Sequence, residues 1–143
     1  QEWSHARRSG GLLAIALVDV DWFKRYNDHY GHPAGDACLR EIAQALATTI
    51  NRSTDLVARY GGEEFVFLAP MTDLAGVRGM ANKLLQAVKA LALPHELSPL
   101  GRVSVSIGIA AAAPGQEASA DTLVAKADAS LYEAKKQGRN QVA

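Results

Sequence analysis

The sequence predicts one α/β domain, an α+β sandwich in which helices pack on the faces of a mixed central sheet that contains a β-hairpin, as in ferredoxin-like folds. Three observations predict this class. Apolar segments of strand length alternate with amphipathic helical segments, a glycine pair joins two of the apolar segments, and no repeat or low-complexity tract interrupts the order. At 143 residues, of which 48% are hydrophobic, the chain has the length of one domain with a sizeable core.

The first third of the chain predicts a strand followed by helical segments. Residues 11–21 form a nearly continuous apolar run that ends in Asp19 and Asp21, which is typical of a strand buried on both faces. Residues 22–36 predict a short helical turn and then a loop, because glycine and proline recur there. Residues 37–50 carry apolar side chains at helical spacing and predict an amphipathic helix.

The middle of the chain predicts a β-hairpin and a long helix. Residues 55–70 consist of two apolar runs joined at Gly61 and Gly62, which tolerate the positive φ angles of a tight turn. Thr72 is the expected N-cap of a helix over residues 73–91.

The end of the chain predicts one more strand and one more helix. Residues 102–112 alternate and then run apolar, as a strand does, and residues 120–138 predict a helix closed by Gly138. A short final strand could follow at residues 140–143. The expected order is therefore β, α, α, β, β, α, β, α.

The composition argues against two classes of partner. Lys and Arg total 15 and Asp and Glu total 15, so no basic excess suggests nucleic acid or an anionic membrane. The longest apolar run, residues 12–18, is far shorter than the ~20 residues that span a bilayer, and no direct membrane insertion is expected. The single cysteine, Cys38, predicts a buried thiol in a reducing compartment. The expected location is cytoplasmic, either free or as the cytoplasmic part of a membrane-anchored protein.

Four carboxylates would meet if the hairpin turn lies near the end of the first strand: Asp19, Asp21, Glu63 and Glu64. Such a cluster repels itself unless a cation neutralises it, and oxygen ligands without His or Cys favour Mg²⁺ or Mn²⁺. For either pair alone, solvent-facing carboxylates at strand ends are the simpler interpretation.

Several blocks of the sequence, in this order, resemble the diguanylate cyclase domain of the GGDEF family. They are "DVDWFK", "ND", "YGHPAGD", "RYGGEEF", "VSVSIGIA" and "ADASLYEAKKQGRN", of which the fourth carries the GGEEF form of the family signature. The resemblance covers nearly the whole of residues 1–143. It implies a nucleotidyl cyclase architecture, which agrees with the fold predicted from periodicity.

The resemblance implies condensation of two GTP molecules into cyclic di-GMP and pyrophosphate by a homodimer, since one monomer holds half of the reactants. Two Mg²⁺ (or Mn²⁺) ions suit such phosphoryl chemistry. By resemblance, Asp19, the Val20 carbonyl and Glu63 would hold metal. Glu63 or Glu64 would also assist proton removal, and the sequence does not separate these two roles.

The resemblance also assigns the nucleotide contacts. Gly61 and Gly62 would let the nucleotide lie against the hairpin backbone, although they would make the turn in any case. Asn27 and Asp36 would recognise guanine, whose N1–H and exocyclic amine a carboxylate accepts. Without the family, Asn27 would indicate a helix end and Asp36 a helix N-cap.

Four further residues complete the implied substrate site. Phe23 is expected in the core beneath it, and Lys24 resembles a phosphate or metal-site residue of the family. Lys135 and Arg139 would grip the β- and γ-phosphates, but cations at a helix C-terminus are also favourable without a ligand, by ~0.3–1 kcal/mol.

An inhibitory product site is implied by "RSTD", which matches the RxxD motif of the family. Arg52 would bind the phosphate and guanine of cyclic di-GMP and Asp55 would fix the site, while Lys83 roughly occupies the place of a second ligand-binding arginine.

The resemblance has one gap, because the family's usual opening segment, of the form DxLTGLxNR, is absent before the first strand. The chain is therefore expected to be a fragment of a larger protein that carries an N-terminal sensor domain. The alternative is a catalytically silent domain that binds GTP or cyclic di-GMP. Such a domain would be expected to lack part of the set Asp19, Gly61, Gly62, Glu63 and Glu64, and the sequence retains all of it.

Overall fold

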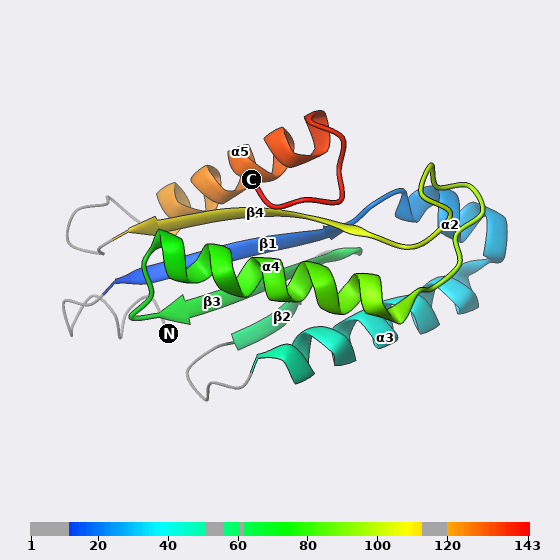
Figure 1. Cartoon of the computed structure of the whole chain (residues 1–143), viewed down its shortest axis with the longest axis horizontal. Helices are drawn as coiled ribbons and strands as arrows, with labels where there is room; N and C mark the ends of the chain where they lie inside the picture. The colour runs from blue at the N-terminus through cyan, green and yellow to red at the C-terminus, as the bar shows by residue number, and fades with distance from the viewer. Residues whose placement is uncertain (1–11, 51–55, 61, 113–119) are drawn as a thin grey trace.

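The order of helices and strands is as the sequence predicts. The computed structural model describes residues 12–50, 56–60, 62–112 and 120–143 (Figure 1). Their elements are β1 (Leu13–Val20), α2 (Phe23–Tyr30), α3 (His32–Thr49), β2 (Leu56–Tyr60), β3 (Glu64–Pro70), α4 (Leu74–Leu91), β4 (Val105–Ala112) and α5 (Ala120–Lys136). None of the helices in these segments is both long and apolar enough to cross a membrane.

The sheet has four strands in the order β2-β3-β1-β4. All neighbouring strands pair antiparallel, which corrects the expected mixed sheet. The physical reason is that each helical crossover joins two parallel strands that are not neighbours: β3 lies between β1 and β2, and β1 lies between β3 and β4. Among the described residues, the parallel pairing is limited to the bridge between Ile107 and Val142, where the sequence suggested a short final strand.

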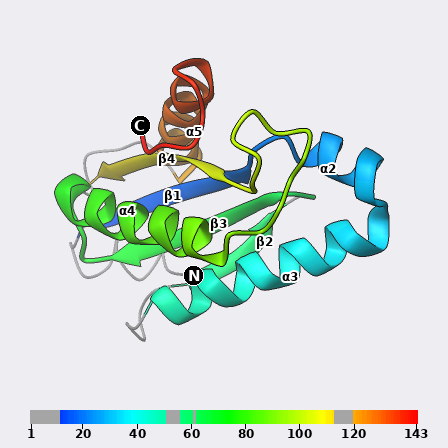
Figure 2. The ribbon, with the colours of Figure 1, turned by 45° about the vertical axis from the view of Figure 1, so that its right-hand side comes forward.

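The helices cover both faces of the sheet (Figures 1 and 2). On one face, α3 and α4 bury the larger core, which includes Phe65 and Phe67 of β3. On the other face, α5 packs on a smaller cluster of β1 and β4 side chains. All eight residues of β1 are consequently buried, as its apolar sequence predicts. Cys38 belongs to the larger core, and burial raises the pKa of its thiol to about 11, so the thiol stays protonated.

Two helix starts differ from the sequence-based expectation. Helix α3 begins at His32, within the segment expected to be a loop, because Pro33 is tolerated in the first helical turn and Gly31 absorbs the chain reversal at φ 93°. Helix α4 is capped by Asp73 instead of Thr72. The Asp73 side chain accepts a hydrogen bond from the Gly76 amide at 2.8 Å.

Helix α5 lies unusually close to β4 at Gly108. A Cβ atom at that position would stand 2.2 Å from both the Ala127 carbonyl oxygen and the Leu131 amide nitrogen. The missing side chain therefore lets the helix backbone settle on the strand, and this contact fixes where the last turn of α5, with Lys135, lies relative to the end of β1.

Candidate functional site

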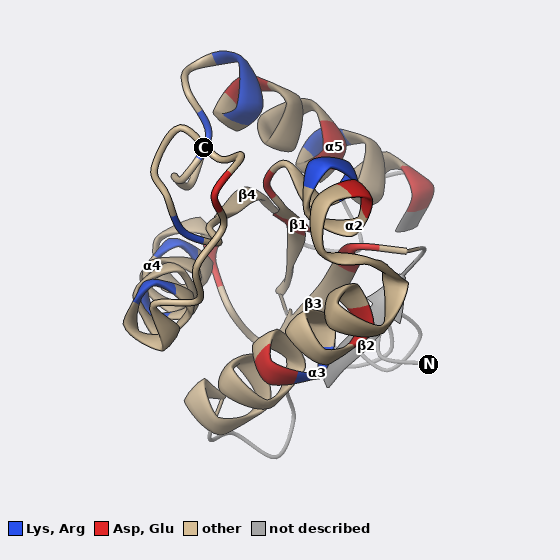
Figure 3. Cartoon of the chain, turned by 90° about the vertical axis from the view of Figure 1, so that its right-hand side faces the viewer, with Lys and Arg blue, Asp and Glu red and all other residues tan. Residues whose placement is uncertain are grey.

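The end of β1, the β2–β3 hairpin, α2 and the last turn of α5 face the viewer in Figure 3. Residues of these elements line two clefts. The first, here called the β1 cleft, has a volume of about 180 Å³ and is lined by Asp19, Val20, Asp21, Trp22, Phe23, Lys24, Glu63, Lys135 and Arg139. The second, here called the α2–α3 cleft, has a volume of about 430 Å³ and is lined by Phe23, Lys24, Asn27, Asp28, His32, Asp36, Leu39, Gly62 and Glu63. Because Phe23, Lys24 and Glu63 line both, the clefts adjoin.

Asp19 lies at the end of β1, on the side of the sheet that α5 covers. It is 3% exposed, and its Oδ2 atom accepts a hydrogen bond from the Lys135 ammonium. Burial raises the pKa of Asp19, and the nearby carboxylates of Glu63 and Asp21 raise it further, while Lys135 lowers it. The Asp19 carboxylate is thus partly desolvated and already forms an ion pair with the Lys135 ammonium.

The two glutamates of the hairpin occupy different positions. Glu63 lies in the turn and lines both clefts, and its carbonyl accepts a hydrogen bond from the Val20 amide at 3.2 Å. Glu64 begins β3 directly opposite Asp19 and lines neither cleft. Burial raises the pKa of Glu64, followed by repulsion from Asp19. The geometry therefore distinguishes two residues that the sequence could not separate.

Asp21, the fourth carboxylate of the expected cluster, accepts hydrogen bonds from protein groups on both of its oxygen atoms. Its Oδ1 atom accepts from the Ser106 hydroxyl at 2.6 Å, and its Oδ2 atom accepts from the Ser104 hydroxyl at 2.7 Å and from the Asn140 amide at 3.1 Å. The Asp21 side chain thus connects the end of β1 to the start of β4 and to the segment after α5. Sequence reasoning did not identify these partners, although the alternation in "VSVS" places both serines on one face of a strand.

The residues of the β1 cleft fit a divalent cation. Three carboxylates line it, those of Asp19, Asp21 and Glu63, together with Val20. Both oxygens of Asp21 already accept hydrogen bonds from the protein, whereas the Lys135 ammonium beside Asp19 shows that a cation is accommodated there. Within the described segments, no group of three or more His, Cys, Asp and Glu side chains is arranged to hold an ion. An ion here would therefore need ligands from substrate phosphates or water, as Mg²⁺ usually does.

Asn27 and Asp36 lie on neighbouring helices and both line the α2–α3 cleft. Asn27 is inside α2, and Asp36 is inside α3, whose N-cap is Gly31, so the helix-end interpretations of both residues are wrong. The Asn27 Oδ1 atom is buried and has no hydrogen-bond partner among the described residues. It lies where a Cβ atom at residue 35 would come within 1.7 Å, so Gly35 makes room for the amide.

The cationic side chains approach the β1 cleft from two elements. Lys24 of α2 is exposed and lines both clefts. Lys135 is in the last turn of α5, and Arg139 follows that helix with a left-handed backbone, φ 64°. The Arg139 guanidinium lies 4.0 Å from the centre of the Trp22 ring. Trp22 is part of the cleft wall as well.

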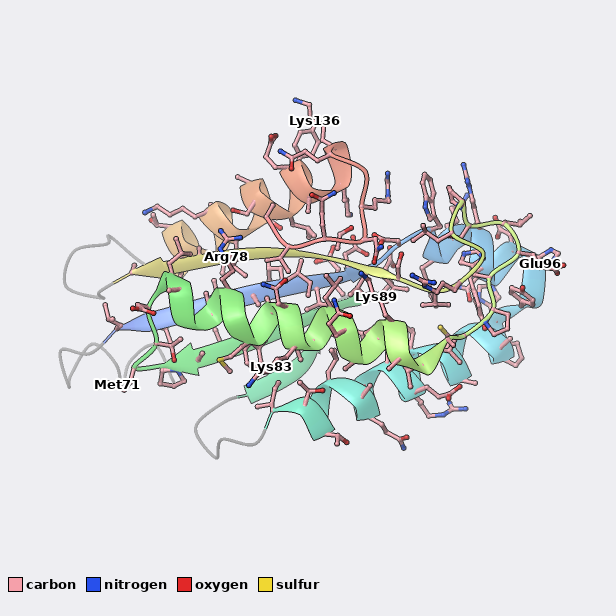
Figure 4. All side chains as sticks on the ribbon, in the orientation of Figure 1. Met71, Arg78, Lys83, Lys89, Glu96 and Lys136 are labelled. Atoms are coloured by element: carbon pink, nitrogen blue, oxygen red, sulfur yellow. The ribbon has the colours of Figure 1, made fainter. Side chains whose placement is uncertain are left out.

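The predicted roles of four residues are not tested by these clefts. Gly61, Arg52 and Asp55 lie outside the described residues, so their predicted roles stay predictions. Lys83 is exposed on α4 and lines neither cleft, and Figure 4 shows it projecting from the middle of that helix. Its predicted part in an inhibitory site stays a prediction as well.

Three comparisons with known proteins agree with this geometry. The sequence model of the family described as "Diguanylate cyclase, GGDEF domain" matches residues 1–141. The diguanylate cyclase DgcP of Pseudomonas aeruginosa is 41% identical over 142 residues, which is 99% of this chain and 21% of DgcP. This chain therefore spans about a fifth of that relative's length.

Solved structures of cyclase domains have the same fold. The crystal structure of the diguanylate cyclase SiaD in complex with its activator SiaC, from Pseudomonas aeruginosa, matches with a TM-score of 0.87 at 34% identity, covering 99% of this chain and 53% of that one. The GGDEF domain of DgcB from Caulobacter crescentus, in complex with c-di-GMP, matches with a TM-score of 0.87 at 32% identity, covering 99% of this chain and 82% of that one.

Proposed function

We propose that this chain, which belongs to the GGDEF family of diguanylate cyclase domains, condenses two GTP molecules into cyclic di-GMP with release of pyrophosphate. The observation that carries the proposal is the joining of the two clefts. One is lined by carboxylates and cations suited to a metal-bound triphosphate, and the other by an amide and a carboxylate suited to a polar base. A nucleoside triphosphate has these two parts at its two ends.

The β1 cleft would hold the triphosphate. Asp19, the Val20 carbonyl and Glu63 would hold Mg²⁺ or Mn²⁺, which supplies neutralisation of phosphate charge and a lowered pKa for the attacking 3′-hydroxyl. Lys135 and Arg139 would bind the terminal phosphates, the arginine through paired N–H groups. Lys24, exposed where the clefts adjoin, is placed to meet the phosphates between base and metal.

Proton removal from the 3′-hydroxyl falls to Glu63 or Glu64 in this proposal. The raised pKa of Glu64 makes its carboxylate a better proton acceptor than a free glutamate side chain, whereas access to the substrate favours Glu63 because it lines both clefts. We favour Glu63 as the metal ligand and Glu64 as the residue that tunes the charge of Asp19.

The α2–α3 cleft would select guanine. The Asp36 carboxylate can accept hydrogen bonds from the N1–H and the exocyclic amine, and the Asn27 Oδ1 atom, which has no partner among the described residues, can accept a further N–H of the base. Adenine presents an unprotonated N1 to the same carboxylate. Gly62 is consistent with this placement, because a Cβ atom there would meet nothing within 4 Å and the space beside it is open.

The reaction would require two copies of the chain, because one pair of clefts accommodates one GTP and each 3′-hydroxyl must attack the other nucleotide. Product inhibition through Arg52, Asp55 and Lys83, a cytoplasmic location and an N-terminal sensor domain in the whole protein remain proposals of the family resemblance. DgcP is much longer than this chain, which is compatible with such a domain.

The proposal is tested by replacing Glu63 with Gln, which keeps the shape of the side chain and removes its charge. We expect Mg²⁺-dependent turnover of GTP to fall by at least about a thousandfold, since a metal ligand is lost. The matched control is Glu133→Gln, an exposed glutamate on α5 that lines neither cleft. Thermal unfolding of both variants checks that the fold is intact, and a folded Glu63→Gln protein with normal turnover would contradict the metal assignment.

Assays of the unmodified protein distinguish the enzyme from a silent sensor. If the domain is a sensor, calorimetry will detect binding of GTP or cyclic di-GMP, but no product will form from GTP and Mg²⁺. The presence of Asp19 and Glu63 in the β1 cleft, with Glu64 paired opposite Asp19, favours the enzyme.

A further inference from the structure

Trp22 is held rigidly at the point where β1 ends and α2 begins. Its backbone is left-handed, with φ 58°, which is uncommon for a bulky residue. Its carbonyl accepts two hydrogen bonds, from the Tyr26 amide at 3.1 Å and from His95 Nε2 at 3.0 Å. His95 is 1% exposed and comes from the distant segment between α4 and β4. The backbone from which the indole projects is therefore held by contacts with distant parts of the fold.

Two guanidinium groups lie over the Trp22 ring. The Cζ atom of Arg139 is 4.0 Å and that of Arg25 is 4.2 Å from the ring centre. Both distances are well inside the ~6 Å within which a cation is attracted by an aromatic face. The two arginines differ in one respect, because Arg139 lines the β1 cleft and Arg25 lines neither cleft.

The backbone that carries Arg139 is also held in a costly conformation. Arg139 and Asn140 are consecutive residues with positive φ, 64° and 52°. The Asn140 amide donates to the buried Asp21 carboxylate at 3.1 Å, and the Arg139 amide donates to the Ala134 carbonyl at 2.9 Å. Strained backbone of this kind persists only where surrounding contacts enforce it, and it is common at ligand sites.

The charge of Arg139 is not neutralised by the parts of the chain that are described. The ion pairs found there are His29–Glu96, Lys135–Asp19 and Lys136–Glu133, and none includes Arg139. A guanidinium whose flat face rests on an indole still presents its N–H groups at its edge, in the plane where phosphate oxygens bind. The ring thus fixes the orientation of the cation without consuming its hydrogen bonds.

We infer that Trp22 is a positioning residue for the triphosphate: its ring holds the Arg139 guanidinium at the β1 cleft, ready to bind phosphate oxygens. The inference rests on the proposed GTP site and deepens it. Arg25, on the same ring but outside the clefts, has no such role. Trp22 acts through Arg139 and not on the base, so its effect belongs to the phosphate end of the ligand alone.

The test measures equilibrium binding of GTP, guanosine and inorganic tripolyphosphate by calorimetry. Trp22→Leu is expected to weaken binding of GTP and tripolyphosphate by about three- to tenfold, the range of one cation–aromatic contact, and to leave guanosine binding unchanged. Trp22→Phe keeps an aromatic face and should retain most of the affinity. Arg25→Ala is the matched control and should change no affinity by more than about twofold, and thermal unfolding confirms that each variant is folded.

A double-mutant cycle decides whether Trp22 acts through Arg139. In the Arg139→Ala background, adding Trp22→Leu should cause no further loss of tripolyphosphate affinity. An undiminished effect in that background, an equal loss for guanosine, or no effect of Trp22→Leu would overturn the inference. The outcome is separable from that of the proposed function: a protein that forms no cyclic di-GMP but shows the predicted cycle with tripolyphosphate retains the positioning role, whereas one that binds neither GTP nor tripolyphosphate loses both.

Discussion

At the scale of single residues, Asp36 is the side chain that, in the proposed site, would most directly decide which base the α2–α3 cleft accepts. Replacing it with Ala removes a charged hydrogen-bond acceptor, an interaction typically worth about 1.5–3 kcal/mol. We therefore expect GTP affinity to fall by roughly ten- to a hundredfold, while ATP affinity, which owes nothing to Asp36 in the proposed site, should stay unchanged. Dissociation constants for both nucleotides measure the effect.

The control for this change is Asp121→Ala, since Asp121 is an exposed carboxylate at the start of α5 that lines neither cleft. Equal losses of GTP and ATP affinity in Asp36→Ala would show that the residue does not read the base.

Glu64 offers a prediction about pH. Burial and Asp19 raise its pKa above the ordinary value of 4.5, so the folded protein binds a proton more readily than the unfolded chain. At a pH above 4.5 the charged Glu64 side chain therefore lowers the free energy of unfolding. This destabilisation disappears as the pH falls below 4.5, because the side chain is then protonated in both states. Glu64→Gln should consequently raise the melting temperature at pH 7, and the gain should shrink at pH 4. Thermal unfolding of the two proteins at both pH values measures this.

A melting-temperature gain that is as large at pH 4 as at pH 7 would contradict the electrostatic origin of the effect. Activity gives a second comparison, because the same substitution is expected to lower turnover while it stabilises the fold. A functional carboxylate is often retained at such a cost in stability.

At the scale of elements, the close contact between α5 and β4 sets the position of Lys135. A Cβ atom on Gly108 would overlap the backbone of Ala127 and Leu131, so Gly108→Ala should push α5 outward. We expect a loss of about 1–3 kcal/mol in the free energy of unfolding, as for other overpacked interiors, together with weaker GTP binding. Urea unfolding and calorimetry measure the two effects.

Gly79→Ala in α4 is the matched control. A Cβ atom there meets nothing within 4 Å, and Ala is favoured over Gly inside a helix by ~0.5–1 kcal/mol. This variant should be slightly more stable and bind GTP normally. If Gly108→Ala were as stable as the unmodified protein, α5 would not be seated as the structure has it.

The elements also show what the sequence could and could not predict. Periodicity predicts each segment because it is a local property, and the order of strands and helices is confirmed. Which strands are neighbours is not local, and so the expected mixed sheet was wrong. The sequence does not predict the early start of α3, because Pro33 and Gly35 are typical of a loop, although proline is also favourable in a first helical turn.

At the scale of the whole molecule, the site depends on contacts between distant parts of the chain. Residues of the first strand and of the carboxylate pair could be selected from sequence blocks, and the structure places Asp19, Glu63 and Lys135 around one cleft. The hydrogen bonds of Asp21 to Ser104, Ser106 and Asn140 span 83 to 119 residues, and the sequence around Asp21 does not predict them. The stacking of Arg139 on Trp22 is of the same kind.

The two adjoining clefts would together hold one nucleotide in the proposed site, whereas the proposed reaction joins two nucleotides. Catalysis should therefore depend on encounters between two copies, and its rate should rise faster than in proportion to the protein concentration until dimers predominate.

The most direct measurement is to incubate the purified protein with GTP and Mg²⁺ over a wide range of protein concentrations and to separate the products by chromatography. The account predicts that cyclic di-GMP and pyrophosphate form, and that at low protein concentration the rate of formation becomes proportional to the square of the protein concentration. No cyclic di-GMP at any concentration, from a protein that is folded and supplied with both GTP and metal, would contradict it.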